Sequence, residues 1–400
     1  MPTGDLPDTG RHVRPDANGE MAYSTYRLDD VCEIIMGQAP RGEAYNTELE
    51  GWPLIAGPGD FGLVRPSPKK FTRKASKISR PGDVIVGIRA SIGSRVLADG
   101  EYCLGRGVAA LRPLPGLHSQ FLWHWLGHSA AMLASKGRGA TFKQLSREDI
   151  GELEISLPSV EEQDRRAKIL DQAEILLARR QEAITLFDDL AAATFIDMFG
   201  DPASNPHDWN SSTIGHVAEQ VTDGEHLTPR REAEGIKLLS ARNVRDGYID
   251  FSNVDHIGPE EHARIRRRCD PRRGDVLISC SGTIGRVAPV ETDEPFSLVR
   301  SAALVRPRMS LVTTDYLAGY LRTPALRARM LRAARSSSHA NLFQGPLRNL
   351  PVLCPPIGLQ VEFGLRIRSI ARLRGAHTAH LAKLEDLFSA LRYRAFEGKL

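Results

Sequence analysis

Few residue patterns in this chain could support catalysis. The stretch Gly57-Pro58-Gly59-Asp60-Phe61-Gly62 could cradle a phosphate, but it lacks a flanking strand and helix and is typical of a turn. Asn205-Pro206-His207-Asp208 departs at its third and fourth positions from the Asn/Asp-Pro-Pro-aromatic tetrad of amino-methyltransferases. A Walker loop, a Gly-x-Ser-x-Gly elbow and a His-Glu-x-x-His pair are missing, and the 12 histidines form no ligand-spaced cluster. The sequence therefore predicts a non-catalytic protein without a metal or cofactor of its own.

Two copies of Gly-Asp-Val carry the carboxylates Asp83 and Asp275. Paired carboxylates could serve acid–base chemistry. A turn closed by Gly and Asp before a buried strand accounts for both copies equally well, and we favour that interpretation.

The basic and polar residues of this chain are better suited to binding nucleic acid than to catalysis. The net charge of +4 and pI near 8.8 permit such binding without requiring it. Phosphates attract Lys and Arg, whereas base edges are read by Arg, Lys, Asn, Gln, Ser or Thr. Three segments of each half qualify. In the first half they contribute Lys69, Lys70, Arg73, Lys74 and Lys77, then Arg89 and Ser91, then Lys136, Arg138, Thr141 and Lys143. In the second half they contribute Arg264, Arg266, Arg267 and Arg268, then Ser281 and Thr283, then Arg335, Ser337, Ser338 and Asn341.

The third pair of segments is favoured most, because its small residues would let the backbone approach a phosphate or a groove wall. For each basic cluster the alternative is a solvated surface. The first segments, 69–77 and 261–269, correspond at a constant offset in the sequence. Paired segments differ in content, which predicts two unlike half-sites and hence an asymmetric DNA target.

The elements that would position these residues occur twice. GDVIVGIRASIG at 82–93 recurs as GDVLISCSGTIG at 274–285, an offset of 274 − 82 = 192. Later pairs, such as Pro158 with Pro355, are offset by 355 − 158 = 197. A period of this length indicates a duplicated domain rather than a solenoid.

Each half reads as a mixed α and β domain followed by a long helix. Short apolar runs predict strands at 84–88, 108–111, 155–157, 276–279, 302–305 and 350–354, with single helices at 121–134 and 316–334. Uninterrupted helical patterns cover about 160–199 and 358–397. The apolar seam of the long helices comprises Leu170, Ala173, Leu177, Ile184, Phe187 and Ala191, and then Ile367, Ile370, Leu381, Leu384 and Phe388. Arg374 and His377 interrupt the second seam. The two helices most simply pack on each other; alternatively, each covers its own domain.

Composition agrees with this organisation. With 41% hydrophobic and 26% charged residues, the chain is ordinary for a soluble globular protein. Its five widely spaced cysteines indicate reduced thiols and a cytoplasmic location rather than a disulfide framework or zinc site. Residues 1–22 lack the apolar stretch of a signal peptide and are expected to be a disordered leader.

The order of these features resembles the DNA specificity subunits of type I restriction-modification systems. The resemblance covers about 23–400. It rests on the GDV…IG strands and on three kinds of matching segment. These are the openings Leu28-Asp29-Asp30-Val31-Cys32-Glu33-Ile34 and Ile214-Gly215-His216-Val217-Ala218-Glu219, the junctions Leu157-Pro158…Glu162-Gln163 and Cys354-Pro355-Pro356…Gln360, and the helix ends Phe199-Gly200-Asp201 and Phe396-Glu397-Gly398. The chain departs from the family in having Gly358-Leu359-Gln360 where Glu commonly precedes Gln.

The resemblance implies an α+β fold with two pseudo-symmetric target-recognition domains, at 23–159 and 201–357. Two conserved helices, at 160–200 and 358–400, would pair antiparallel as a coiled coil and fix the distance between the half-sites of a bipartite DNA site. It also implies that these helices dock two methyltransferase subunits, joined by motor restriction subunits, in a phage-defence complex. S-adenosylmethionine, ATP and magnesium chemistry would then belong to the partners. The alternatives are a coiled-coil scaffold that binds only protein in another defence complex, and an enzyme with an unrecognised site.

Overall fold

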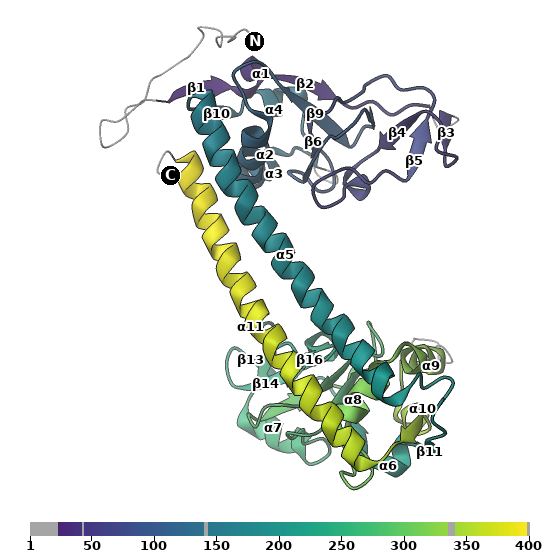
Figure 1. The fold of residues 1–400 in the computed structure, drawn as a ribbon. Coiled ribbons are helices and arrows are strands. Elements are labelled where there is room, and N and C mark those ends of the chain that lie inside the picture. Colours follow the sequence, from purple (N-terminus) through teal and green to yellow (C-terminus); the bar gives the residue numbers. More distant parts are fainter. Residues whose placement is uncertain (1–22, 42–43, 140–142, 335–340, 398–400) are drawn as a thin grey trace. The chain divides into compact units, whose positions relative to one another are not determined.

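The computed structural model describes residues 23–41, 44–139, 143–334 and 341–397. The chain divides into two compact units, Met1–Arg180 with His380–Leu400 and Gln181–Ala379. Each unit therefore holds one globular domain and part of both long helices (Figure 1). The predicted leader, 1–22, lies outside the described residues.

The first unit contains three sheets. Their strand orders are β2-β9-β6-β7, β3-β5-β4-β8 and β1-β10, with β4 and β8 parallel and the other pairs antiparallel. The strands are β1 Ser24–Arg27, β2 Cys32–Met36, β3 Tyr45–Asn46, β4 Trp52–Ile55, β5 Lys70–Thr72, β6 Val84–Gly87, β7 Arg95–Leu97, β8 Cys103–Leu104, β9 Val108–Pro113 and β10 Glu154–Leu157. The helices are α1 Leu28–Val31, the 3-10 helix η2 Pro58–Asp60, α2 Ser119–His128, α3 Ala130–Lys136, α4 Arg147–Gly151 and the first half of α5 Val160–Phe199.

The second unit repeats these sheets as β12-β21-β18-β19, β13-β17-β14-β20 and β11-β22, and adds the hairpin β15-β16. Its strands are β11 Asn210–Thr213, β12 Ala218–Asp223, β13 Arg231–Glu232, β14 Ile236–Leu239, β15 Val244–Arg245, β16 Tyr248–Ile249, β17 Asp255–Ile257, β18 Val276–Ser279, β19 Val287–Pro289, β20 Phe296–Leu298, β21 Ala302–Pro307 and β22 Pro351–Cys354. Its helices are α6 Ile214–Val217, η3 Ala241–Asn243, α7 Pro259–Arg266, α8 Thr314–Arg322, α9 Pro324–Ala334, α10 Gln344–Arg348 and α11 Ile357–Phe396. The predicted duplication and α+β class are confirmed.

The Gly-Asp-Val motifs form turns tied to a neighbouring strand. Asp83 accepts a hydrogen bond from the backbone N–H of Arg80 at 2.7 Å and two from the guanidinium of Arg112 on β9, each at 2.9 Å. Asp275 accepts the same set from Arg272 N at 2.8 Å and from Arg306 on β21 at 2.8 Å. Both carboxylates are buried, so they stabilise the turn that starts β6 or β18, as the sequence indicated.

The predicted single helices at 121–134 and 316–334 are wrong, because each is two helices. Ser129 separates α2 from α3 with a ψ of 2°, which ends the regular helix. Thr323 separates α8 from α9 in an extended conformation, φ −60° and ψ 147°. Its neighbour Pro324 explains this, since the residue before a proline is pushed out of the helical region.

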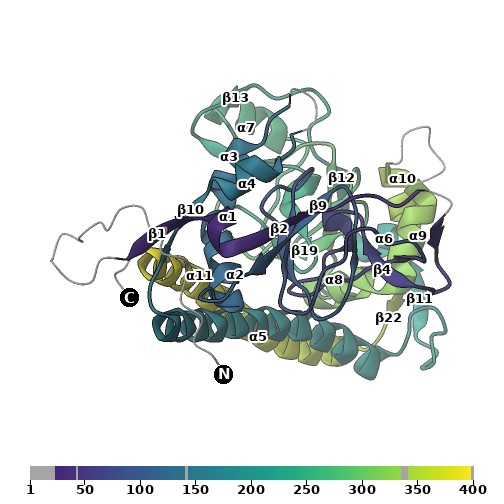
Figure 2. The same ribbon diagram turned by 90° about the horizontal axis from the view of Figure 1, so that it is seen from above.

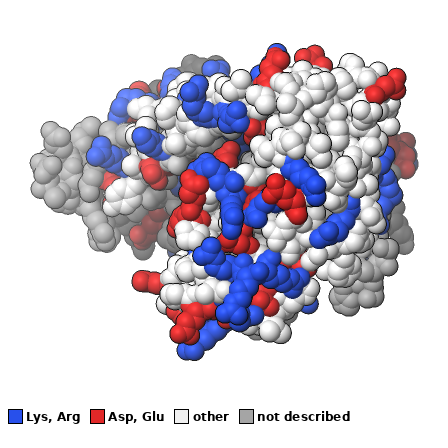
Figure 3. All heavy atoms as spheres, turned by 90° about the horizontal axis from the view of Figure 1, so that it is seen from below, with Lys and Arg blue, Asp and Glu red and all other residues white. Residues whose placement is uncertain are grey.

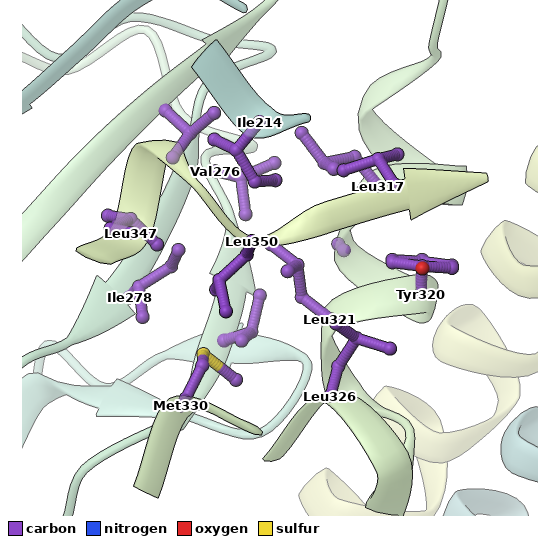
Figure 4. Packing of buried hydrophobic residues seen from close by; sticks show 14 of the residues in the cluster. Ile214, Val276, Ile278, Leu317, Tyr320, Leu321, Leu326, Met330, Leu347 and Leu350 are labelled. Atoms are coloured by element: carbon purple, nitrogen blue, oxygen red, sulfur yellow. The ribbon is translucent and has the colours of Figure 1, made fainter. Parts of the chain in front are cut away.

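The core of the second unit lies between the sheet containing β18 and the helices α8, α9 and α10 (Figure 4). Val276 and Ile278 on β18 face Leu317 and Leu321 of α8 and Met330 of α9 in one buried cluster. The same layout recurs in the first unit, where Val84 and Val86 of β6 pack with Phe121 and Leu122 of α2. In both units, the apolar side chains on one face of the sheet thus pack against the apolar faces of the helices, as their spacing in the sequence predicts.

The two long helices lie side by side in both views (Figures 1 and 2). In the second unit Phe195 of α5 meets Phe363 of α11, with ring centroids 5.5 Å apart. In the first unit Arg166 of α5 donates to the Ala395 carbonyl of α11 at 2.5 Å. Early residues of one helix therefore face late residues of the other, and the pair is antiparallel. The alternative that each helix covers only its own domain is wrong.

The predicted seam residues are less exposed than most of their neighbours along the helices. Leu170 and Ile184 are buried, and the other predicted seam residues are half-buried, whereas their neighbours along the helices are mostly exposed. The ends of the helices are also anchored alike. Phe199 packs on Tyr316 at 4.8 Å between ring centroids, and Phe396 packs on Phe121 at 5.2 Å.

A buried glutamine fixes the start of each long helix. Gln163 accepts a hydrogen bond from His118 N at 2.9 Å and donates to the carbonyls of Gly116 and Pro158, both at 3.0 Å. Gln360 makes the corresponding three bonds in the second unit. The Pro…Gln junction of the sequence is thus a structural joint between recognition domain and helix.

Two further expectations can be compared with the structure. All five cysteines are free thiols, and burial raises the pKa of Cys269 and Cys280 to about 12. Such thiols are unreactive, in agreement with a packing role. Among the described residues, no helix is long and apolar enough to cross a membrane.

Candidate nucleic-acid interface

In each unit a backbone hydrogen bond joins two of the predicted DNA-contact segments. Leu145 N donates to Ile88 O at 3.0 Å in the first unit, and Leu342 N donates to Cys280 O at 2.9 Å in the second. These bonds hold the loop that follows β6 or β18 against the segment before α4 or α10. Segments that lie 145 − 88 = 57 and 342 − 280 = 62 residues apart in the sequence thereby form one composite surface in each unit, which we call the loop pair.

In the first unit, Gln144 forms hydrogen bonds with both segments of the loop pair. Its backbone exchanges hydrogen bonds with Arg138 at 3.1 and 2.9 Å, and its side-chain oxygen accepts one from Arg89 Nε at 3.0 Å. The Arg138 guanidinium reaches Asp149 at 3.0 Å, yet the side chain remains 81% exposed. Ser91 and Lys143 are also exposed, and Lys136 is half-buried. Two predicted arginines thus flank one amide side chain at the surface.

In the second unit Ser281 forms an isolated antiparallel bridge with Asn341. Asn341 corresponds to Gln144 at the offset 341 − 144 = 197, so both loop pairs carry an amide side chain directly before the anchoring leucine. The Asn341 Oδ1 atom is buried and accepts no hydrogen bond from any described residue. Thr283 is exposed. The predicted residues Thr141, Arg335, Ser337 and Ser338 lie outside the described residues.

The first pair of predicted segments is not structurally equivalent, and that correspondence is wrong. Residues 69–77 include β5, whereas 261–269 lie mostly on helix α7. By strand order the counterpart of β5 is β17, at Asp255–Ile257. The equivalent strands give offsets of 236 − 52 = 184 for β4 and β14 and 255 − 70 = 185 for β5 and β17, so the offset of 192 begins only after α7, which lies between β17 and β18.

These two segments also differ electrostatically. Lys69, Lys70, Lys74 and Lys77 are exposed and form no ion pair with another described residue, while Arg73 pairs with Glu50. In α7, by contrast, Arg264 binds Glu261 and Glu225, Arg266 lies 3.3 Å from Asp270, and Arg268 pairs with Asp223; Arg267 is exposed. The lysine-rich segment of the first unit is thus the more available to phosphate.

Ion pairing has a visible consequence on the surface. On the face in Figure 3, Lys and Arg side chains are interleaved with Asp and Glu rather than forming a continuous basic field.

The ion pair of Arg138 with Asp149 is one example. Hydrogen bonds from Ser146 and charges including Arg138 lower the pKa of Asp149, so this carboxylate stays ionised beside Arg138. Such pairing fixes the direction of a guanidinium, which suits selective readout better than nonspecific attraction.

Sequence reasoning missed Gln144 and a second-unit network around Asp223. The Asp223 carboxylate accepts hydrogen bonds from Gln344 at 2.5 Å and from Arg268, and His226 lies 2.9 Å from it. The repeat itself contained the signal for Gln144, because it aligns with the chosen Asn341. The residues around Asp223 come from three separate segments, so no local pattern could have joined them.

The glycine-rich stretch at 57–62 forms a turn, as predicted. Its Pro58–Asp60 part is a 3-10 helix closed by Asp60, which accepts a hydrogen bond from Ala56 N at 2.8 Å. A Cβ atom at Gly87 would lie 2.9 Å from Pro58 Cγ and 2.7 Å from the Ser91 carbonyl oxygen. Gly87 is therefore required for this turn to pack against the loop pair.

Comparison with known proteins agrees with this geometry. Residues 21–186 match the family model described as the type I restriction modification DNA specificity domain. The putative type I restriction enzyme MjaX specificity subunit of Methanocaldococcus jannaschii is 33% identical over 146 residues, which is 36% of this chain and 34% of that relative. The match thus spans about a third of that protein. The type I restriction enzyme EcoBI specificity subunit of Escherichia coli is 21% identical over 93% of this chain and 85% of its own length.

Solved structures share the fold along the whole chain. The crystal structure of a type I restriction-modification S subunit from M. genitalium aligns with a TM-score of 0.58 at 16% identity, covering 99% of both chains. A chain from a structure titled for complex assembly and conformational transition of the type I R-M system aligns with a TM-score of 0.52 at 20% identity, covering 99% of this chain and 100% of that one. The matched residues 21–186 therefore carry a type I restriction modification DNA specificity domain, and the solved structures show that the whole chain has the fold of these subunits.

Proposed function

We propose that this chain selects the DNA target of a type I restriction-modification complex and performs no catalysis itself. Each recognition domain reads one half of an asymmetric bipartite site through its loop pair. The observation that carries this proposal is the repeated Ile88–Leu145 and Cys280–Leu342 anchoring, because it presents polar side chains at matching places on two unlike surfaces.

Unlike side chains at matching places support an asymmetric target. The first loop pair offers Arg89, Arg138 and Gln144, whereas the second offers Ser281, Thr283 and Asn341. Arginine pairs best with guanine, and Asn or Gln pairs best with adenine, through bidentate bonds in the major groove. We therefore expect a guanine contact in the half-site read by the first unit, whereas the hydroxyl groups of Ser281 and Thr283 in the second unit can donate to or accept from base edges.

The long helices are proposed to set the spacing of the half-sites and to hold two methyltransferase subunits. Apolar residues that face away from the seam support a docking role, since exposed leucines in a row mark interaction surfaces. These residues are Ile175, Leu176, Leu186 and Leu190 on α5 and Leu365, Leu373 and Leu387 on α11. We further propose that two motor restriction subunits join this core, and that the partners supply S-adenosylmethionine, ATP and magnesium chemistry.

The test is selection of bound sequences from a random duplex library by the chain mixed with its cognate methyltransferase subunit. We expect a bipartite motif with unlike halves and a fixed spacer, and binding that weakens steeply with salt as counterions are released. Enrichment of a single contiguous motif would contradict the proposal that each domain recognises one half of a bipartite site. No enrichment at any salt concentration would favour a scaffold that binds only protein, and strand cleavage or methylation by the chain alone would favour an enzyme.

A further inference from the structure

Three potential metal donors meet between α2 and α5 in the first unit. His124 of α2, Asp171 of α5 and Glu174 of α5 each offer one ligand atom, and these atoms lie within 4.8 Å of one another. Asp171 and Glu174 are three residues apart, so they share one face of the helix. An imidazole with carboxylates is a donor set that Zn²⁺ accepts in proteins.

The orientation of His124 leaves one ring nitrogen available. Nε2 lies 2.7 Å from Asp171 Oδ1, whereas Nδ1 has no hydrogen-bond partner among the described residues and lies 3.8 Å from Glu174 Oε1. The side chain is 0% exposed. A carboxylate bound to one nitrogen orients a metal-binding histidine and presents its other nitrogen to the ion. The 3.8 Å separation of Nδ1 and Oε1 is compatible with two ligand-to-zinc distances of about 2.1 Å at a bent angle.

The charges around the cluster favour a cation. Asp171 and Glu174 contribute two negative charges, and Arg95 contributes one positive charge at 3.8 Å from Glu174 Oε1. The Arg95 guanidinium is held over the ring of Trp123 at 4.2 Å, and the Trp123 indole donates to Glu174 Oε2 at 3.2 Å. The two carboxylates outweigh Arg95, but Arg392 lies close enough to act on the charge of Arg95, and the two arginines limit the affinity for a cation.

The second unit shows that the fold does not need this cluster. Ser119 donates to Gly82 O and Thr314 donates to Gly274 O, so α2 and α8 correspond at 314 − 119 = 195. His124 then corresponds to Gly319, while the 197 offset of the long helices pairs Asp171 with Arg368 and Glu174 with Ala371. Gly319, Arg368 and Ala371 instead line a cavity of about 370 Å³. The donor set is thus specific to the first unit.

We propose that His124 Nδ1 and Glu174 bind one divalent transition-metal ion such as Zn²⁺, with Asp171 positioning the imidazole. The ion ties α2, which belongs to the recognition domain, to the long helix α5. Mg²⁺ is a poor alternative, because it prefers oxygen ligands in near-ideal octahedral geometry.

The test uses the full-length protein after removal of metals with a chelator. Calorimetric titration with Zn²⁺ should show one saturable site per chain, and Zn²⁺ should raise the melting temperature whereas millimolar Mg²⁺ should not. Glu174→Gln should abolish the site, and Asp171→Asn should weaken it by about 10- to 100-fold. The control is Asp315→Asn, which removes a carboxylate that pairs with Arg368 at the corresponding helix contact of the second unit and should leave Zn²⁺ binding unchanged.

Two outcomes would overturn the proposal. One is no saturable Zn²⁺ binding, which would leave an ordered water as the partner of His124 Nδ1. The other is binding that persists undiminished in Glu174→Gln, which would place the ion on surface histidines. If Glu174→Gln does not fold, Co²⁺ added to the wild-type chain should give visible absorption bands of four- or five-coordinate cobalt; their absence would equally reject the site. These readouts do not depend on DNA binding, so they are independent of the proposed function.

Discussion

Arg374 of α11 and Asp188 of α5 form an ion pair across the two long helices of the second unit, with Nε 3.0 Å from Oδ1. The same guanidinium lies 4.9 Å from the ring centroid of Tyr248. One turn along, His377 packs edge-on against Phe187 at 5.0 Å between ring centroids. The two polar residues that interrupt the predicted apolar seam are therefore part of the helix contact and do not break it.

Asp188→Ala should lower the free energy of unfolding by about 0.5–1 kcal/mol, because the pair is only partly buried. The measurement is the urea midpoint of the full-length chain. Asp197→Ala, at an exposed position of the same helix, is the matched control and should leave the midpoint unchanged. Equal effects of the two substitutions would mean that the ion pair contributes nothing beyond the loss of a surface carboxylate.

Leu170→Glu should disrupt the helix pair in the first unit. Leu170 is 0% exposed, and an isolated buried carboxylate costs several kcal/mol, so we expect loss of the folded unit or a drop of about 3 kcal/mol or more. Leu384→Glu, on the facing helix, should act in the same direction. Circular dichroism during thermal unfolding measures both.

Leu176→Glu is the matched control for Leu170→Glu, because Leu176 is 52% exposed on the same helix. It should leave unfolding almost unchanged and yet weaken binding of the methyltransferase subunit, as measured by analytical ultracentrifugation. Normal assembly by Leu176→Glu would argue against the outward leucines as the docking surface. Normal assembly by Leu170→Glu would reject the helix pair as a ruler.

Asp83→Ala should destabilise the first unit by about 3–5 kcal/mol. It removes the buried carboxylate partner of the half-buried Arg112, which keeps only the exposed Glu33 as an ionic partner, at 3.0 Å. The double substitution of Asp83 and Arg112 by apolar residues should recover much of this loss, which a denaturant series can measure. A loss as large in the double variant as in the single one would show that the turn, rather than the ion pair, depends on Asp83.

Gln163→Leu should cost about 3 kcal/mol, since it deprives three buried backbone groups of their hydrogen bonds. Gln163→Glu should also destabilise, because a carboxylate cannot donate to the Gly116 and Pro158 carbonyls. Gln360→Leu should have a similar effect in the second unit. A cost below about 0.5 kcal/mol in either unit would mean that water replaces the glutamine at the joint.

The sequence was informative where the fold repeats and weak where the two units differ. The seam around Leu170 and the GDV turns were predictable, because local periodicity and turn chemistry determine them. The break at Ser129 is not reported by apolar periodicity, whereas the break at Thr323 was indicated in the sequence by Pro324 and was missed. The false match of 69–77 with 261–269 arose because the second unit has extra elements there. His124, Asp171 and Glu174 were missed because His124 is 47 residues from Asp171, so only tertiary packing brings them together.

Different substitutions should affect the discrimination between base pairs and the general affinity for DNA. Arg138→Ala should remove about 1–3 kcal/mol of discrimination at one base pair while leaving the other half-site unaffected, because the exposed guanidinium lies on the loop pair. Asn341→Ala should do the same for the half-site read by the second unit.

Lys69→Ala should instead weaken binding to all DNA sequences alike and reduce the salt slope by about one phosphate contact. Each variant is compared by titrating matched, half-site-altered and random duplexes at several salt concentrations. Lys168→Ala, on the exposed face of α5, should change neither quantity. If Lys69→Ala shifted base preference while Arg138→Ala weakened all duplexes equally, residues 69–77 would be the reading surface and the loop pair the phosphate clamp.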